Sequence, residues 1–244
     1  MRHVRRWCAE ALGAFFLVLI GPGAVMVNAS SHGAIGQAGI ALAFAFVIIA
    51  MIHALGPLSG AHLNPAVTVG FWSVRRFPAK EALPYVGAQC AGAVAASAVL
   101  RGVLGPVGQM GATLPNIPLA SAFVVEWLLS FALMFVIIAG ATDERVADGF
   151  AGIAVGLTVG FDAIMGGQLT GASMNPARSF GPALVGGLWH AHWLYWIAPI
   201  TGAIVAPRSY EWLRGQPPRS VVKSASSGQG PLTASAERHR VPPF

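Results

Sequence analysis

Two copies of one triplet, Asn64-Pro65-Ala66 and Asn175-Pro176-Ala177, decide how this sequence can fold. Each follows a Gly-Ala step, Gly60-Ala61 in the first copy and Gly171-Ala172 in the second, and each lies in strongly apolar sequence. Asn is a favourable N-cap, and Pro in the first helical position lacks only an N–H that would have had no partner. Each triplet therefore predicts the start of a helix.

The two predicted helices are short, because the residues that suit them cover only 66–72 and 177–184. At ~1.5 Å per residue, each is less than half as long as a ~30 Å hydrocarbon core is thick. We interpret them as half-helices that enter a membrane from opposite faces and direct both positive dipole ends at its middle. The side-chain carbonyls of Asn64 and Asn175 would then accept capping N–H groups, while their NH₂ groups face a pore. The alternative is that the two triplets lie in surface turns and have the same three residues by chance.

The composition is typical of an integral membrane protein. Of the 244 residues, 55% are hydrophobic and only 10% are charged, against ~25% charged in soluble domains. No charged residue lies between Glu10 and Arg75 or between Arg101 and Glu126, and stretches of this length predict membrane spans. The net charge of +6 resides in loops and tails, so we expect no nucleic-acid partner. Two cysteines are too few for a disulfide framework or a metal site, and no cofactor is predicted.

Six membrane spans are predicted, over residues 7–28, 35–55, 81–104, 120–141, 147–165 and 188–213. Pro57 and Gly60 are expected to end the second span, and residues 105–119, rich in Pro and Gly, to connect the two halves. Basic residues gather in the loops of one side, which predicts cytoplasmic termini and a location in the plasma or inner membrane. Residues 214–244 are expected to form a disordered cytoplasmic tail.

The two halves of the chain resemble each other. Residues 10–17 read EALGAFFL and residues 126–133 read EWLLSFAL, and each stretch precedes an Asn-Pro-Ala triplet by two spans. Three spans per repeat is an odd number, so the copies, residues 7–104 and 120–213, must be inverted relative to the membrane. The predicted fold is therefore an all-α membrane protein in which six transmembrane helices and two half-helices form one domain over residues 1–213.

The stretches around the triplets resemble the two signature loops of the aquaporin family, also called major intrinsic proteins: residues 59–68 read SGAHLNPAVT and residues 171–179 read GASMNPARS. The resemblance covers residues 7–213 and implies the aquaporin-like fold, a pore in each protomer and a homotetramer. Residues 141–143 and 171–174 resemble the corresponding stretches in members of the plant nodulin-type branch of this family and its bacterial relatives. The function implied is passive conduction of water and small uncharged solutes, such as glycerol and neutral metalloid hydroxides, without ions or protons.

The family's outer constriction is built from four positions, which match Phe44, Ala163, Ala172 and Arg178 in this sequence. Arg178 would offer fixed donors to a solute and repel cations. Water-selective members carry His where this chain has Ala163, so the resemblance implies a wider and less polar opening. Ser179, by contrast, fits the pattern of the water channels. We therefore expect a water channel with a permissive filter.

Three acids lie in apolar sequence. The resemblance implies that Glu10 and Glu126 accept hydrogen bonds from the backbone of the two Asn-Pro-Ala loops, and the alternative places them in the headgroup zone. Asp162, adjacent to Ala163, is either a structural acid bonded to loop backbone or a charge that lines the mouth of the pore. His62 is expected to face the cytoplasmic vestibule.

Other classes of protein fit the sequence less well. An intramembrane hydrolase would need a nucleophile elbow, and the stretch around Ser173 lacks its second Gly, so no enzyme activity is expected. An ion-coupled secondary transporter shares inverted repeats and broken helices, but it needs embedded acids at the repeat interface. Glu10 and Glu126 instead repeat symmetrically near the cytoplasmic side. A junction protein with a closed pore would show no solute flux.

Overall fold

The computed structural model describes residues 2–143 and 149–215, and within these residues the regular structure is helical. Met1–Tyr210 form one compact unit. The predicted tail, apart from residues 214 and 215, lies outside the described residues. In chain order the elements are α1 (Arg2–Ser30), α2 (Gly36–Ser59), α3 (Pro65–Ser73), α4 (Ala79–Leu104), the 3₁₀ helix η1 (Gly108–Gly111), α5 (Leu119–Thr142), α6 (Ala151–Thr170), α7 (Pro176–Gly186) and α8 (Leu194–Arg214).

Five helices, α1, α2, α4, α5 and α6, are long and apolar enough to cross a membrane. They correspond to the first five predicted spans. The sixth predicted span corresponds to α8, a helix of 21 residues that begins later than expected because residues 188–193 form turns. Arg208, Glu211 and Arg214 lie in the last two turns of α8, and α8 is not among the five helices that meet the criteria of length and apolar composition.

The prediction that Pro57 ends the second span is wrong. α2 continues through Pro57 to Ser59 and is closed by Gly60, whose φ is 90° and whose N–H bonds the carbonyl of Gly56. A proline three residues from the end of a helix removes only one of its last hydrogen bonds. The predicted end of the fifth span at residue 165 is also wrong. α6 extends to Thr170 and is closed by Gly171, whose φ is 87°.

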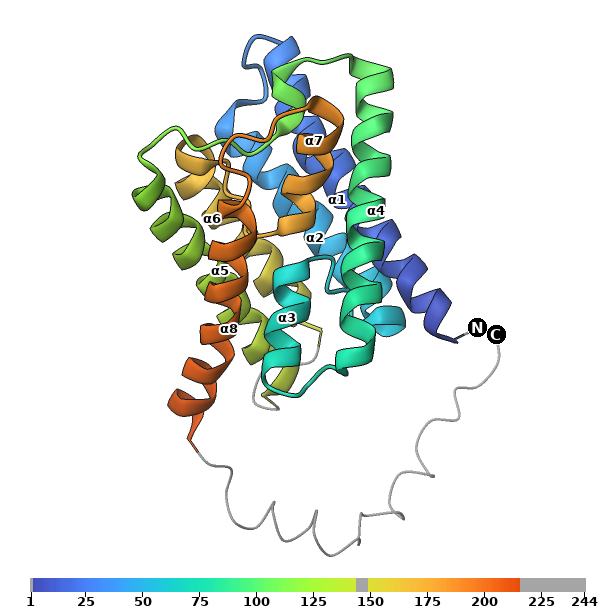
Figure 1. Ribbon diagram of the computed structural model, residues 1–244, viewed down its shortest axis with the longest axis vertical. Helices are drawn as coiled ribbons and strands as arrows, with labels where there is room; N and C mark the ends of the chain where they lie inside the picture. The colour runs from blue at the N-terminus through green and yellow to red at the C-terminus, as the bar shows by residue number, and fades with distance from the viewer. Residues whose placement is uncertain (1, 144–148, 216–244) are drawn as a thin grey trace, which may run out of the picture. The chain divides into compact units, whose positions relative to one another are not determined.

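The two half-helices are present, as α3 with 9 residues and α7 with 11. Oδ1 of Asn64 accepts the N–H of Ala66 at 2.8 Å, and Oδ1 of Asn175 accepts the N–H groups of Ala177 and Arg178 at 3.0 and 3.2 Å. Each helix therefore begins where its Asn-Pro pair predicts. In Figure 1, α7 and α3 lie one beyond the other among the longer helices, and the two half-helices are in contact.

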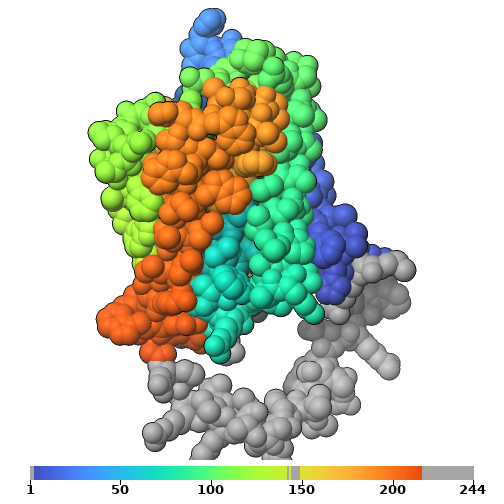
Figure 2. All heavy atoms as spheres, in the orientation of Figure 1, coloured from blue at the N-terminus to red at the C-terminus, as the bar shows by residue number. Residues whose placement is uncertain are grey.

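Each half-helix packs against long helices of the other half of the chain. The buried cluster around α3 draws its members from α3, α5 and α8: Ala66, Val67, Met134, Ile138, Ala203 and Ala206. The cluster around α7 draws its members from α1, α4 and α7: Val18, Ala93, Ala96 and Ala177. Figure 2 shows α7 at the surface beside α4. The two halves are therefore interlocked through their half-helices.

The pairing of α1 with α4 depends on Gly92. A Cβ at this position would lie within 3.0 Å of backbone atoms of Ala11 in α1. We expect Gly92→Val to lower the melting temperature of the purified protein by roughly 5–10 °C, because overpacking costs ~1–3 kcal/mol and the helices must separate. Gly87→Val is the matched control, since a Cβ at Gly87 in the same helix has no neighbour within 4 Å. Equal melting temperatures for the two variants would contradict this packing.

Candidate functional site: the cavity at the half-helix ends

A cavity of about 180 Å³ lies where the N-terminal ends of α3 and α7 meet. Its walls are mostly apolar side chains of α1, α2, α5 and α6, among them Leu17, Ile48 and Leu133. The cavity is also lined by Asn64, Asn175 and the four positions matched to the outer constriction: Phe44, Ala163, Ala172 and Arg178. Pro65, Ala66, Pro176 and Ala177 are buried behind it in the first turns of the half-helices.

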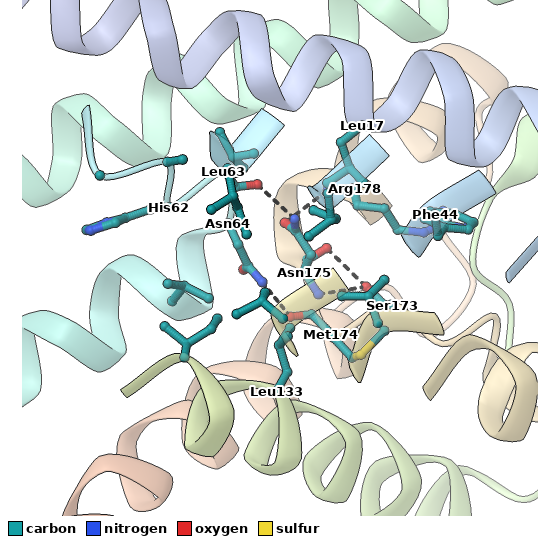
Figure 3. A pocket seen from close by; sticks show the side chains of 18 of the residues that line it. Leu17, Phe44, His62, Leu63, Asn64, Leu133, Ser173, Met174, Asn175 and Arg178 are labelled. Atoms are coloured by element: carbon teal, nitrogen blue, oxygen red, sulfur yellow. Dashed lines mark hydrogen bonds between the residues drawn. The ribbon is translucent and has the colours of Figure 1, made fainter. Parts of the chain in front are cut away.

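The two Asn side chains tie the loops to each other as well as capping the helices. Nδ2 of Asn64 donates to the carbonyl of Met174 at 2.8 Å, and Nδ2 of Asn175 donates to the carbonyl of Leu63 at 2.8 Å (Figure 3). One N–H of each NH₂ group is therefore bonded to the opposite loop, while both Asn residues line the cavity. Because an amide carries two N–H bonds, each Asn keeps one donor beyond the bond between the loops.

The loops before the half-helices have the same unusual backbone. Ala61 and Ala172 have φ of 46° and 43°, and Leu63 and Met174 have φ of 52° and 53°. Positive φ is uncommon for residues other than glycine and costs of order 1–3 kcal/mol each. Such a conformation persists only where surrounding groups hold it in place.

Two buried carboxylates hold these loops. Glu10 accepts the N–H groups of His62 at 3.0 Å and Leu63 at 2.7 Å, and neither Glu10 nor Glu126 has any exposed surface. The alternative that places the two acids in the headgroup zone is therefore wrong. Glu126 accepts the equivalent bonds of the second loop, from the N–H groups of Ser173 and Met174 at 2.9 Å each and the hydroxyl of Thr170 at 2.6 Å.

Arg178 is buried beside the cavity and is held from two sides. Its Nη1 donates to the carbonyl of Gly111 at 2.8 Å, and its guanidinium carbon lies 5.2 Å from the centre of the Phe44 ring. Gly111 has φ of 64°, and a Cβ there would come within 2.8 Å of the backbone of Pro22, so this position requires glycine. No local pattern marks Gly111 in the sequence, because the Pro and Gly residues of 105–119 indicate only a connection.

Asp162 is buried and is not among the residues that line the cavity, which contradicts its interpretation as a charge that lines the mouth of the pore. Its Oδ2 has no hydrogen-bond partner among residues 2–143 and 149–215, so this oxygen makes no bond to loop backbone there. His62 does line the cavity, with Nδ1 3.1 Å from Oγ1 of Thr68. Within the same residues, no group of three His, Cys, Asp or Glu side chains could hold a metal ion.

Long apolar helices around a cavity with a few fixed polar groups define an integral membrane protein of the channel class. A model of the major intrinsic protein family matches residues 1–210. The chain therefore belongs to the major intrinsic protein, or aquaporin, family, whose members are channels and not enzymes.

Relatives of this chain are known from Glycine max and Archaeoglobus fulgidus, and a similar structure has been solved from Plasmodium falciparum. Nodulin-26 of Glycine max is 42% identical over 230 residues, covering 93% of this chain and 85% of its own. The probable aquaporin AqpM of Archaeoglobus fulgidus is 42% identical over 241 residues, and the match covers 87% of this chain and 98% of that protein. The X-ray structure of the aquaglyceroporin from Plasmodium falciparum superposes with a TM-score of 0.77 at 28% identity. The superposition covers 85% of this chain and 95% of that one. These similarities agree with the nodulin-like branch.

The position of Ala172 in the cavity wall can be tested with mercurials. Cys8 is exposed and Cys90 is partly buried, and neither lines the cavity. We expect mercuric ion to leave the water permeability of wild-type proteoliposomes unchanged. It should remove most of the water permeability of Ala172→Cys, because the bound metal occupies the cavity, and a thiol reductant should restore it. Strong inhibition of the wild type would mean that the cavity has been assigned to the wrong residues.

Proposed function

We propose that the protein is a passive channel for water and small uncharged solutes, including glycerol and neutral metalloid hydroxides. The observation that carries the proposal is the cavity in which two Asn-capped half-helix ends meet beside Arg178. Membership of the family and the similarity to an aquaglyceroporin support it. The Asn amides and the guanidinium supply hydrogen bonds to the solute, and most of the other residues that line the cavity are apolar.

The proposed channel excludes ions by the sign of its electrostatic potential. The N-terminal end of each half-helix carries a partial positive charge of roughly half an elementary charge, and both ends meet at the cavity. Arg178 adds a full positive charge at the constriction that we propose it forms with Phe44, Ala163 and Ala172. Cations, including protons passed along a file of water, therefore meet a barrier.

The interlocked half-helices favour a channel over a secondary transporter. Alternating access requires one repeat to rock against the other. Here such a motion would break both hydrogen bonds between the loops and pull α3 from α5 and α8. The acids Glu10 and Glu126 are bonded to loop backbone, which leaves them engaged in structure and not free to couple an ion. A solute flux that rises linearly with the concentration gradient and has a low temperature coefficient would distinguish a channel from a secondary transporter.

We further propose that residues 1–213 form the channel domain, with inverted repeats over 7–104 and 120–213, and that four copies assemble in the cell's plasma or inner membrane. Both termini would be cytoplasmic, with residues 214–244 as a tail. The placement of the basic loops and the resemblance to the family support these statements. Chemical cross-linking in membranes and protease protection of tagged termini would test assembly and orientation.

The proposed permissive filter predicts the effect of a larger side chain at Ala163. Ala163→His should reduce glycerol permeability by roughly tenfold and water permeability by less than about threefold. The imidazole narrows the opening and offers a contact that water can use, whereas the CH and CH₂ groups of glycerol cannot. Stopped-flow light scattering on proteoliposomes, corrected for protein amount, measures both. If the wild type passes no glycerol and Ala163→His changes neither flux, the permissive filter is ruled out.

Removing the charge of Arg178 should weaken ion exclusion. We expect Arg178→Ala to conduct protons or small cations measurably while still passing water, because a fixed charge and a bulky side chain are both lost. Arg101→Ala is the matched control, since Arg101 is exposed, bonds the carbonyl of Val185 and lies outside the cavity. A cation current through the wild-type protein in planar bilayers would contradict the proposed function itself.

A further inference from the structure

A side chain four residues after each Asn links the half-helix to the loop before it. Oγ1 of Thr68 lies 3.1 Å from Nδ1 of His62, and Oγ of Ser179 lies 2.5 Å from Oγ of Ser173. His62 and Ser173 both line the cavity. In both halves, therefore, this hydroxyl bonds a group on the cavity wall.

In the first half, a side chain from a long helix completes this network. Nε2 of Gln89 in α4 donates to Oγ1 of Thr68 at 3.1 Å and to Glu10 at 2.8 Å. One turn earlier in α4, the hydroxyl of Tyr85 donates to the carbonyl of Ser59 at 2.8 Å. Gln89 therefore fixes the hydroxyl that holds the first loop.

The second half has no such residue at the equivalent place. Tyr195 in α8 donates to the carbonyl of Thr170 at 2.7 Å, so it corresponds to Tyr85. The residue one turn later, the counterpart of Gln89, is Pro199, whose side chain has no donor. The missing bond comes from Thr113, in the connection between the halves, whose Oγ1 donates to Oγ of Ser179 at 2.7 Å.

The hydrogen atoms in this chain of hydroxyls have one consistent order. Each hydroxyl carries a single hydrogen. The hydroxyl of Ser173 donates to the carbonyl of Asn175 at 3.0 Å, so Ser179 donates to Ser173 and Thr113 donates to Ser179. All three side chains are buried, with exposed fractions of at most 4%. Fully satisfied buried networks of this kind rigidify their surroundings.

We propose that Thr113 is a positioning residue of the outer constriction and a determinant of its solute selectivity. Residues 111 and 113 of the connection hold adjacent residues of α7: Gly111 accepts from Arg178, and Thr113 donates to Ser179. A side chain that does not line the cavity thus fixes the distance between Arg178 and the opposite wall. This inference rests on the proposed function, because it is read out as solute flux.

The variant that tests this role is Thr113→Val, which keeps the shape of the side chain and removes the donor. Because a hydrogen bond of the network is lost and Arg178 becomes less restrained, we expect the ratio of glycerol to water permeability to rise by roughly threefold. Thr113→Ser, which keeps the hydroxyl, should retain the wild-type ratio. Thr158→Val is the matched control, because Thr158 is buried and its hydroxyl donates to the carbonyl of Ala154 in its own helix, at 2.8 Å.

A double-variant cycle distinguishes positioning from general destabilisation. Ser179→Ala breaks the next link, so it should raise the ratio similarly, and adding Thr113→Val should change it no further. Independent effects of the two changes, or equal ratios in Thr113→Val and Thr158→Val, would overturn the proposal. So would failure of both Thr113→Val and Ser179→Ala to fold, since the role would then be purely structural.

The same measurements separate this inference from the proposed function. A wild-type protein that passes water but no glycerol contradicts the proposed solute range and not the role of Thr113. The comparison then uses water permeability alone, which must differ between Thr113→Val and Thr158→Val. Equal water permeabilities in that case would overturn the inference.

Discussion

Hydrogen bonds from two buried carboxylates to loop backbone allow the chain to leave the helical conformation in the middle of a membrane. Hydrocarbon offers no partner for a free N–H, so non-helical backbone at that depth must be satisfied within the protein. Glu10 and Glu126 each accept two consecutive loop N–H groups and one hydroxyl. The positive φ angles of the loops and the starting points of α3 and α7 depend on these bonds.

The same bonds determine the electrostatics of the cavity. With the loops held by acids from behind, the Asn side chains bond across the cavity to the opposite loop, and the ends of the two half-helices are fixed close together. Glu10 and Glu126 lie within the unit, yet both accept hydrogen bonds from backbone donors and neither lines the cavity. The cavity is lined by the Asn amides, the Arg178 guanidinium, His62 and Ser173, with apolar side chains over most of its wall, an arrangement suited to uncharged solutes.

The sequence predicts the features that depend on neighbouring residues and misses those that depend on distant contacts. The Asn-Pro pairs specify the starts of α3 and α7 because capping is a local interaction. Glu10 and Glu126 could be matched because they recur at equivalent places in the two halves. The bonds of Asn64 to Met174 and of Arg178 to Gly111 join residues far apart in the chain, and no local pattern marks them.

The interlocked half-helices also constrain the order of events during synthesis. α3 emerges early, yet part of the surface that covers it belongs to α5 and α8, which are made later. Until these helices are inserted, the side of α3 that faces them is uncovered, and the loop before it has its bonds to Glu10 but lacks those to the second loop. The first half of the chain therefore cannot reach its final structure alone, and the unit should fold and unfold cooperatively, with docking of the half-helices as a late step.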